Sequence, residues 1–298
     1  MSNEWIHPSA VVDRRAVLGD RVRVGPLCYV GPEVEIGDDC ELVAHCTLMG
    51  PMRIGRNNRF FPQCVIGAAP QDLKFKGGPT RVDIGDDNAF REGVTVHRGT
   101  EVDRLSGGVT RIGNHNLFMV GAHIAHDCDI GDHVILANSV LLAGHVKLED
   151  CVNVGGGSAM HHFVTVGRNA FIAGLTRITH DAPPYMKIEG YDQAVRGVNS
   201  TGLRRWKISA QSGLNLKQAF KLLYARKGKR ARGQLGALLE EVRGNGLYHD
   251  EHVQYLVEFL ERKLRQGVYG RAREAERVDT VADIQRFYES AAAPGPVQ

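Results

Sequence analysis

The chain has 298 residues, with 37 lysines and arginines against 34 aspartates and glutamates, which gives a formal net charge of +3. Glycine supplies 35 residues and proline only 11, a composition that excludes collagen-like and proline-rich disordered chains. We read no export signal and no run of 18 apolar residues, so we expect a cytoplasmic protein without a membrane span. Six cysteines in such a chain indicate buried thiols in a reducing compartment.

An internal repeat of six residues dominates the first two thirds of the chain. A large apolar residue occurs at every sixth position from Ile6 to Ile66, from Ile84 to Val96 and from Ile112 to Ile178. Glycine often follows this position, as a chain that turns a corner every six residues requires. Five cysteines stand four positions after it, where the residues are small, which predicts inward-facing thiols: Cys28, Cys40, Cys46, Cys64 and Cys128.

A period of six fits neither an α-helix nor a half-buried strand, so it predicts short strands joined by turns and stacked into a solenoid. The pattern resembles that of the hexapeptide-repeat proteins, whose fold is a left-handed parallel β-helix with about eighteen residues per coil. The left hand opposes the usual right-handed crossover, so it rests on this resemblance alone. We therefore expect a mainly β protein, a left-handed parallel β-helix followed by a C-terminal α-helical domain.

Breaks in the repeat set the expected domains. Residues 67–83 and 97–111 carry proline, glycine and charge and should leave the β-helix, which we assign to residues 1–190, as two excursion loops. Helical spacing predicts helices around 216–224, 235–242 and 253–264 in a second domain, residues 191–298. A capped helix over 280–288 and a disordered tail are expected at its end.

Charge is segregated along the chain. Between Gln193 and Leu239 there are eleven basic residues and no acidic one, so an otherwise acidic protein carries a basic patch. The patch is either a docking surface for an anionic partner or a solvated helix face. Nucleic acid is not the expected partner, because the patch lacks a recognised binding motif and aromatic residues are sparse in it.

Histidines gather on successive coils of the last repeat block. His126, Gly144 and His162 are eighteen residues apart and should stack about 4.8 Å from one another. His123, His145 and His161 fall beside them. Such a cluster predicts a functional site, with imidazoles acting either as zinc ligands or as a general base with anion-binding partners. Asp127 could orient an imidazole in either chemistry.

Several long motifs resemble one family closely. IGAAPQDLKFKGGPTRVDIGD, REGVTVHRGT, GAHIAHDCDIGD, ILANSVLLAGHV, APPY and GVNSTGLRR are similar to segments of the acyl-carrier-protein–UDP-N-acetylglucosamine O-acyltransferases, over roughly residues 5–230. The resemblance implies transfer of an (R)-3-hydroxyacyl group from acyl carrier protein to the 3-hydroxyl of UDP-N-acetylglucosamine, the first step of lipid A biosynthesis. It also implies a homotrimer with sites shared between neighbouring subunits, and no metal or other cofactor.

The resemblance also implies roles for individual residues. His126 would be the general base, Asp127 would assist it, and the Gly144 N–H would face the thioester oxyanion. The acidic acyl carrier protein would dock on the basic patch. The substrates would contact Asp72, Lys74, His123, His145, His161, His162, Gly174, Asn199 and Arg205.

Departures from the family pattern leave several alternatives open. His162 and Thr201 differ from residues common in the family, and Phe171 and Asp192 could shorten the acyl groove beside Gly174, which leaves the acyl length open. The alternatives are a related enzyme with a 3-amino sugar acceptor, the later N-acyltransferase of the pathway, a zinc-dependent hexapeptide-repeat carbonic anhydrase, and a non-catalytic solenoid. The N-acyltransferase would need an additional uridine-binding domain, and the solenoid would need no histidine cluster.

Overall fold

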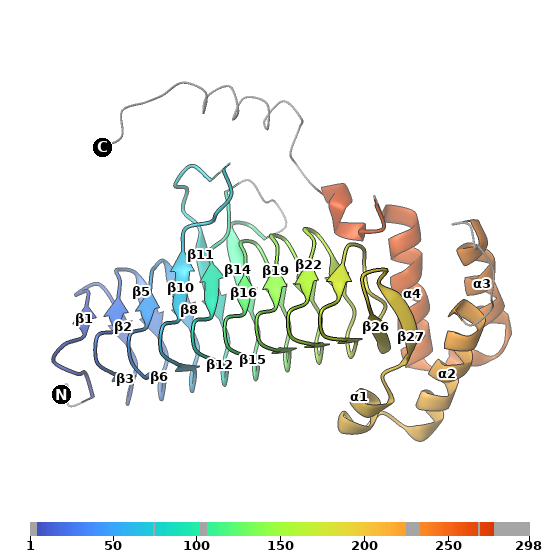
Figure 1. Cartoon of the computed structure of the whole chain (residues 1–298), viewed down its shortest axis with the longest axis horizontal. Coiled ribbons are helices and arrows are strands. Elements are labelled where there is room, and N and C mark those ends of the chain that lie inside the picture. Colours follow the sequence, from blue (N-terminus) through green and yellow to red (C-terminus); the bar gives the residue numbers. More distant parts are fainter. Residues whose placement is uncertain (1–4, 74, 102–105, 225–232, 268, 277–298) are drawn as a thin grey trace.

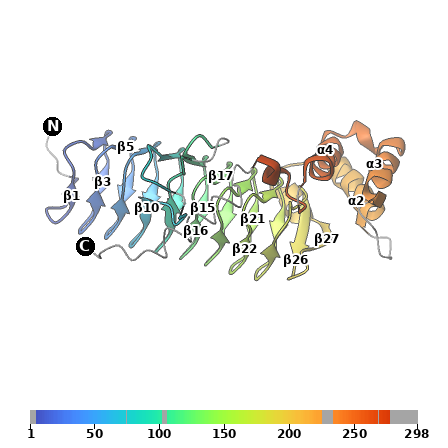
Figure 2. The same cartoon turned by 90° about the horizontal axis from the view of Figure 1, so that it is seen from above.

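The protein is an elongated β-helix with a helical domain at one end (Figures 1 and 2). The computed structural model describes residues 5–73, 75–101, 106–224, 233–267 and 269–276. The fold is the parallel β-helix predicted from the hexad repeat, with the left hand that the resemblance implies. The residues beyond 276, and with them the expected helix over 280–288 and the tail, lie outside the described chain.

Each coil contributes one short strand to each of three parallel sheets, which we call faces 1, 2 and 3. Face 1 contains β1 (Val11–Val12), β4 (Tyr29–Val30), β7 (Thr47–Leu48), β10 (Val65–Ala68), β13 (Thr95–His97), β16 (His123–Ile124), β19 (Leu141–Leu142), β22 (Ala159–Met160) and β25 (Arg177–Ile178). Face 2 contains β2 (Val17–Leu18), β5 (Val34–Ile36), β8 (Met52–Ile54), β11 (Arg81–Ile84), β14 (Val109–Ile112), β17 (Asp129–Ile130), β20 (Lys147–Leu148) and β23 (Thr165–Val166).

Face 3 closes the coils and carries the hairpin that ends the β-helix. Its strands are β3 (Arg23–Val24), β6 (Glu41–Leu42), β9 (Arg59–Phe60), β12 (Ala89–Phe90), β15 (Leu117–Phe118), β18 (Ile135–Leu136), β21 (Asn153–Val154), β24 (Phe171–Ile172), β26 (Met186–Glu189) and β27 (Ala194–Val198). The hexad residues point inward and form the core, where Phe60, Phe90 and Phe118 lie ring against ring at centroid distances of 4.8 and 5.0 Å.

The six-residue period stops at Ile178, but the β-helix continues for part of another coil, within the predicted bounds of residues 1–190. Ala182 pairs with Val166, and β26 pairs in parallel with β24, so that Ile188 lies beside Ile172. This last coil is two residues shorter than the regular eighteen-residue coils, which removes it from the six-residue phase. β27 then pairs antiparallel with β26 and leads into the helical domain.

The predicted helices are present in the helical domain. The three helices predicted around 216–224, 235–242 and 253–264 are α2 (Ala210–Tyr224), α3 (Gly233–Gly244) and α4 (Glu251–Gln266). α1 (Ser200–Arg205) and the short 3-10 helices η1 (Leu247–His249) and η2 (Ala272–Glu276) are not among the predicted elements. α4 docks on the β-helix, where the Tyr255 hydroxyl donates to Glu149 at 2.5 Å and the Arg168 guanidinium lies 3.3 Å from the Tyr255 ring centroid. None of the described helices is long and apolar enough to cross a bilayer.

The cysteine prediction is confirmed by the core. Cys28, Cys40, Cys46, Cys64 and Cys128 are buried, and all six cysteines are free thiols. Burial raises the pKa of both Cys64 and Cys128 to about 12, so these thiols stay protonated and unreactive at neutral pH. They act as small core residues.

Candidate active site

The histidine cluster lies at the corner between faces 1 and 2, on coils joined by β16 and β19. Because β16 and β19 pair in register, with Ile124 beside Leu142, the corner residue His126 falls directly over Gly144 of the next coil. A Cβ atom on Gly144 would stand 2.4 Å from Cε1 of His126, so only glycine fits under this ring. The stacking predicted from the eighteen-residue spacing is present.

Asp127 connects the histidine cluster to the second excursion loop through hydrogen bonds. Its side chain is fully buried and accepts hydrogen bonds from the Thr100 N–H (2.9 Å), the Thr100 hydroxyl (2.7 Å) and the Ser106 hydroxyl (2.6 Å). Burial alone would raise the pKa of Asp127, but the hydrogen bonds from His126, Ser106 and Thr100 outweigh it and lower the pKa. Asp127 is therefore a carboxylate at neutral pH.

This carboxylate fixes the proton on His126. The Nδ1 atom of His126 lies 2.8 Å from Oδ2 of Asp127, and a carboxylate can only accept, so Nδ1 carries the proton. In the neutral ring the lone pair is then on Nε2, which points away from Asp127 and lies 3.8 Å from a carboxylate oxygen of Asp72 in the first excursion loop. A buried imidazole with one nitrogen held and the other unprotonated has the geometry of a general base.

Two further histidines extend the cluster along face 1. His123 shares a 2.7 Å hydrogen bond with the Thr95 hydroxyl, and the His97 ring packs edge-on against His123 with centroids 4.9 Å apart. Burial, then the nearby His123 and His126, lowers the pKa of His97 to about 4. Burial and His126 also lower the pKa of His123. Both rings are therefore neutral at physiological pH.

His145 closes the site on the next coil. Its ring stacks on Phe163 with centroids 4.3 Å apart and lies edge-on to His126 at 5.0 Å. Asp127 and His145 both occupy the left-handed corner conformation, with φ of 60° and 64°. No residue that the structure describes accepts a hydrogen bond from the Gly144 N–H.

A metal ion is the rival occupant. His126, Asp127 and His145 offer ligand atoms within 4.8 Å of one another, which among the described residues makes them the candidate metal group. The Asp127 oxygens already accept four hydrogen bonds. Two come from Thr100, one comes from Ser106, and the fourth comes from Nδ1 of His126. A metal bound there would have to displace those bonds, so this donor set fits the ion poorly.

The remaining predicted residues are dispersed. His161 and His162 lie edge-on to each other at 5.3 Å on the coil after His145, whereas Gly174 is exposed at the corner between faces 3 and 1. Asn199 caps α1 through Gly202 and donates to the Asn169 carbonyl, and Arg205 is exposed at the end of α1. Because α1 lies beyond the end of the β-helix, away from β16, neither approaches His126 within one chain (Figure 1). Lys74 lies outside the described residues.

Two partners of Asp127, Thr100 and Ser106, are not among the residues predicted from the sequence. Thr100 and Ser106 belong to the second excursion loop, and His97 stands at its start. The sequence predicts this loop as a break in the repeat, but a break has no periodicity from which to read which side chains return to the corner. The small polar residues of the loop are the one signal that could have found them.

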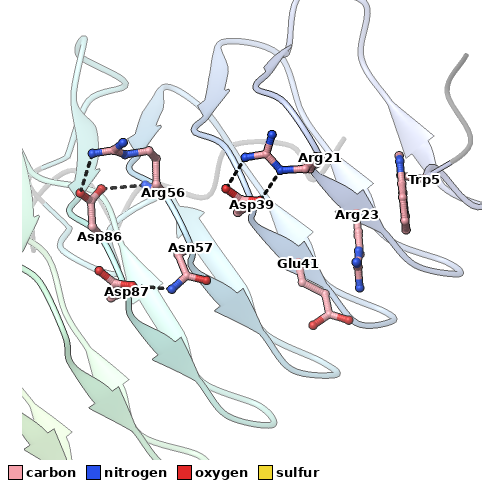
Figure 3. Close-up of a pocket in the computed structure, with 9 residues that line it drawn as sticks. All are labelled: Trp5, Arg21, Arg23, Asp39, Glu41, Arg56, Asn57, Asp86 and Asp87. Atoms are coloured by element: carbon pink, nitrogen blue, oxygen red, sulfur yellow. Dashed lines mark hydrogen bonds and ion pairs between the residues drawn. The ribbon is translucent and has the colours of Figure 1, made fainter. Parts of the chain in front are cut away.

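A hollow on the first coils of the β-helix does not share the chemistry of the histidine cluster. It measures about 600 Å³ and its charged side chains pair with one another, as Arg21 does with Asp39 at 2.6 Å and Arg56 with Asp86 at 3.9 Å (Figure 3). It is lined by Trp5, Arg21, Arg23, Asp39, Glu41, Arg56, Asn57, Asp86 and Asp87. It contains no histidine, and we assign it no function.

Comparison with known proteins gives the family. Residues 181–269 match the model for domain 2 of UDP N-acetylglucosamine O-acyltransferase, and residues 15–50 and 110–144 match the bacterial transferase hexapeptide model. The structure of LpxA from Acinetobacter baumannii is similar with a TM-score of 0.80 and 38% identity, covering 87% of this chain and 97% of that one. The chain belongs to the UDP-N-acetylglucosamine O-acyltransferase family.

Further similar proteins come from distant organisms. The UDP-N-acetylglucosamine acyltransferase of Arabidopsis is 32% identical with a TM-score of 0.76, covering 88% of this chain and 97% of its own. The acyl-carrier-protein–UDP-N-acetylglucosamine O-acyltransferase of Synechocystis is 50% identical over 175 residues. That alignment covers 59% of this chain and 62% of the relative.

Proposed function

We propose that the protein transfers an (R)-3-hydroxyacyl group from acyl carrier protein to the 3-hydroxyl of UDP-N-acetylglucosamine, with His126 as general base. One observation carries this proposal: Nδ1 of His126 is held by the buried Asp127 carboxylate, while Nε2 faces the space beside the Gly144 backbone. Family membership supports the substrate pair, since the name of the Synechocystis relative specifies both substrates and that of the Arabidopsis structure specifies the sugar nucleotide.

The reaction follows from these atoms. Nε2 of His126 takes the proton of the sugar hydroxyl as its oxygen attacks the thioester carbonyl. Charge then develops on the carbonyl oxygen, where the Gly144 N–H donates a hydrogen bond. When the tetrahedral intermediate collapses, the carbon–sulfur bond breaks and the proton on Nε2 passes to the departing thiolate. Asp127 keeps Nδ1 protonated throughout and stabilises the transient imidazolium.

Asp72 is placed to orient the acceptor. Its carboxylate lies on the Nε2 side of His126 at 3.8 Å, close enough to accept a hydrogen bond from a sugar hydroxyl next to the reacting one. Together with His123 it would present the 3-hydroxyl to the base. An amine at the sugar 3-position would meet the same groups, so the acceptor atom is a question for the assay.

A homotrimer is part of the proposal, and the three faces support it. The outward residues of face 2 alternate in charge from coil to coil: Glu35, Arg53, Asp83, Arg111, Asp129 and Lys147. Face 1 instead presents Val11 and Leu141, 60% and 50% exposed, and face 3 presents Leu117 and Ile135. In a trimer faces 1 and 3 of neighbouring subunits pack together and face 2 meets water.

Such packing would complete the site. Its corner lies between faces 1 and 2, so the neighbour's face 3 and the α1 beside it would approach His126. Arg205, exposed on α1, would then supply a guanidinium for the diphosphate of the partner subunit's nucleotide. This explains why Arg205 and His126 do not meet within one chain.

The acyl carrier protein would dock on the helical domain. The basic residues described there are exposed: Arg196, Arg204, Arg205, Lys207, Lys217 and Lys221. The remaining basic residues of the patch, Arg226, Lys227, Lys229, Arg230 and Arg232, lie outside the described chain. We also propose a reducing, cytoplasmic location, supported by the six free thiols.

The test is a product assay. The purified protein is incubated with UDP-N-acetylglucosamine and (R)-3-hydroxyacyl carrier proteins of graded length, with and without a chelator, and the products are identified by mass. We expect an O-acylated sugar nucleotide in equal yield in both conditions. A product only with a 3-amino acceptor would correct the acceptor, and activity lost to the chelator and restored by zinc would contradict the metal-free mechanism.

A further inference from the structure

A short segment after α4, Gly270–Glu276, lies on the same corner of the β-helix as the active site; we call it the strap. It begins one residue after the family model ends at residue 269. The strap includes η2, which lies beside the last coils on the side of the excursion loops (Figure 1). Its contacts therefore concern a part of this chain that the family model does not cover.

The strap is bonded to the last corner by its backbone. The Asp181 N–H donates to the Gly270 carbonyl at 2.9 Å, and the Ala272 N–H donates to the Asp181 carboxylate at 2.8 Å. Gly270 has φ of 75°, and a Cβ there would stand 2.9 Å from Cβ of His180. Only glycine permits this close approach, so the contact is specific.

Buried charges reinforce the attachment. Arg271 and Glu274, 7% and 8% exposed, form an ion pair at 2.8 Å, and Nη1 of Arg271 also donates to the Thr179 carbonyl at 2.8 Å. Lys263 of α4 donates to the Asp181 carbonyl at 2.8 Å. A buried ion pair with the further hydrogen bond to Thr179 restricts the backbone that carries it.

Arg273 extends from this fixed segment to the active site. Its Nη1 donates to the His145 carbonyl at 2.9 Å, two coils before the coil on which the strap is anchored. His145 follows Gly144 directly, and its ring is held between His126 and Phe163. The guanidinium thus holds the backbone that presents both the Gly144 N–H and the His145 ring.

We propose that Arg273 is a positioning residue for the reaction, which sets the Gly144–His145 backbone beside His126 and is itself held by the strap. The proposal rests on the proposed function for its kinetic consequence. The bond from Arg273 restrains the carbonyl of His145, the residue that directly follows Gly144. Without the hydrogen bond from Arg273, the Gly144 N–H, which donates to the developing oxyanion, would shift. Such a displacement lowers the rate of the chemical step.

The experiment compares Arg273→Ala and Arg273→Lys in the full-length protein, with Arg265→Ala as the matched control. Arg265 is exposed near the end of α4 and pairs only with Glu261 among the described contacts. We expect Arg273→Ala to lower kcat about tenfold with the KM for sugar nucleotide and the melting temperature almost unchanged, and Arg273→Lys to recover much of kcat. Wild-type kcat in Arg273→Ala, or an equal loss in Arg265→Ala, would overturn the proposal.

A second variant separates positioning from folding. Asp181→Asn replaces one carboxylate oxygen by an amide that cannot accept from both Thr165 and Ala272, so it loosens the strap without touching Arg273. The double variant with Arg273→Ala should be no slower than the slower single variant, because both remove the same restraint. If the losses of kcat in the two single variants multiply in the double variant, the strap does not act through Arg273. Should Arg273→Ala not fold, the same comparison is made with Arg273→Lys.

Amide hydrogen exchange distinguishes the two proposals. The His145 N–H donates to the His126 carbonyl and the Phe163 N–H to the Gly144 carbonyl, so both report on the corner without substrate. Arg273→Ala should accelerate their exchange even if the product assay fails. Faster exchange without acyl transfer would refute the proposed function alone, whereas unchanged exchange would refute the role of Arg273.

Discussion

At the scale of residues, the site depends on one close contact and one buried carboxylate. Gly144 lets the His126 ring lie against the backbone of the next coil, and Asp127 determines which imidazole nitrogen is protonated. Both roles follow from geometry and from the lowered pKa of Asp127, whose hydrogen bonds outweigh the penalty of burial. Substitution at either position should therefore affect chemistry more than substrate affinity.

Gly144→Ala tests the close contact. The added methyl would lie 2.4 Å from Cε1 and 2.6 Å from Nε2 of His126, so the ring must move away from the reacting hydroxyl. We expect kcat to fall about a hundredfold with a smaller change in KM. Gly197→Ala is the matched control, since its Cβ would meet no atom within 4 Å. Equal kinetics of the two variants would contradict the assignment.

His97 makes folding stability depend on pH. Its pKa is lowered from 6.5 to about 4 in the folded protein, so the unfolded chain binds the proton more readily. The neutral His97 ring contributes fully to the free energy of unfolding above pH 6.5. This contribution, up to about 3 kcal/mol, is lost as the pH falls towards 4. Urea unfolding of wild type and His97→Gln at pH 7 and pH 4.5 should show a smaller pH-dependent loss in the variant; identical losses would refute this.

At the scale of elements, the coil repeat positions the site and the loops complete it. The strict six-residue period is enough to predict that His126 lies over Gly144, because an uninterrupted period determines which residues stack. The loops could not be predicted in this way: Thr100 and Ser106 return to Asp127 through an aperiodic excursion. The shortened last coil escapes prediction for a related reason, since Ile188 pairs with Ile172 out of the six-residue phase.

The docking of α4 is testable as an element. The Tyr255 hydroxyl donates to Glu149, and burial together with this carboxylate raises the pKa of Tyr255 to about 12. Tyr255→Phe leaves the carboxylate without this donor and should cost about 1 kcal/mol of stability. Tyr191→Phe is the control: the exposed Tyr191 hydroxyl accepts a hydrogen bond from Arg177, and its loss should change stability little. Chemical unfolding monitored by circular dichroism compares them, and equal stabilities would be evidence against the interface.

At the scale of the whole molecule, the three faces differ in the polarity of their outward side chains. Face 2 carries alternating charges suited to water. Face 1 and the middle coils of face 3 carry outward apolar side chains suited to neighbouring subunits, although the first coils of face 3 carry charges. The difference in polarity between the faces is present in the sequence, but it can be recognised only once the outward-facing residue of each hexad is known. A trimer would bring the basic helical domain and the site corner of different subunits together.

Leu141→Glu tests this assembly. Leu141 is 50% exposed on face 1, one coil from His123, and a carboxylate there would be buried without a partner in the proposed trimer. We expect the variant to dissociate to smaller species in light scattering and to lose most activity. Val17→Glu, on the charged face 2, changes a similarly exposed valine and should remain trimeric. A trimeric, active Leu141→Glu protein would exclude face 1 from the interface.

The most direct test of the central claim is single-turnover acyl transfer by His126→Ala. Removing the base leaves Asp127 in its hydrogen bonds with Thr100 and Ser106, so the corner should remain folded. The account predicts a rate at least about a thousandfold below wild type, with the affinity for UDP-N-acetylglucosamine, measured by calorimetry, within a few fold. Transfer at the wild-type rate would contradict the assignment of His126 as the general base.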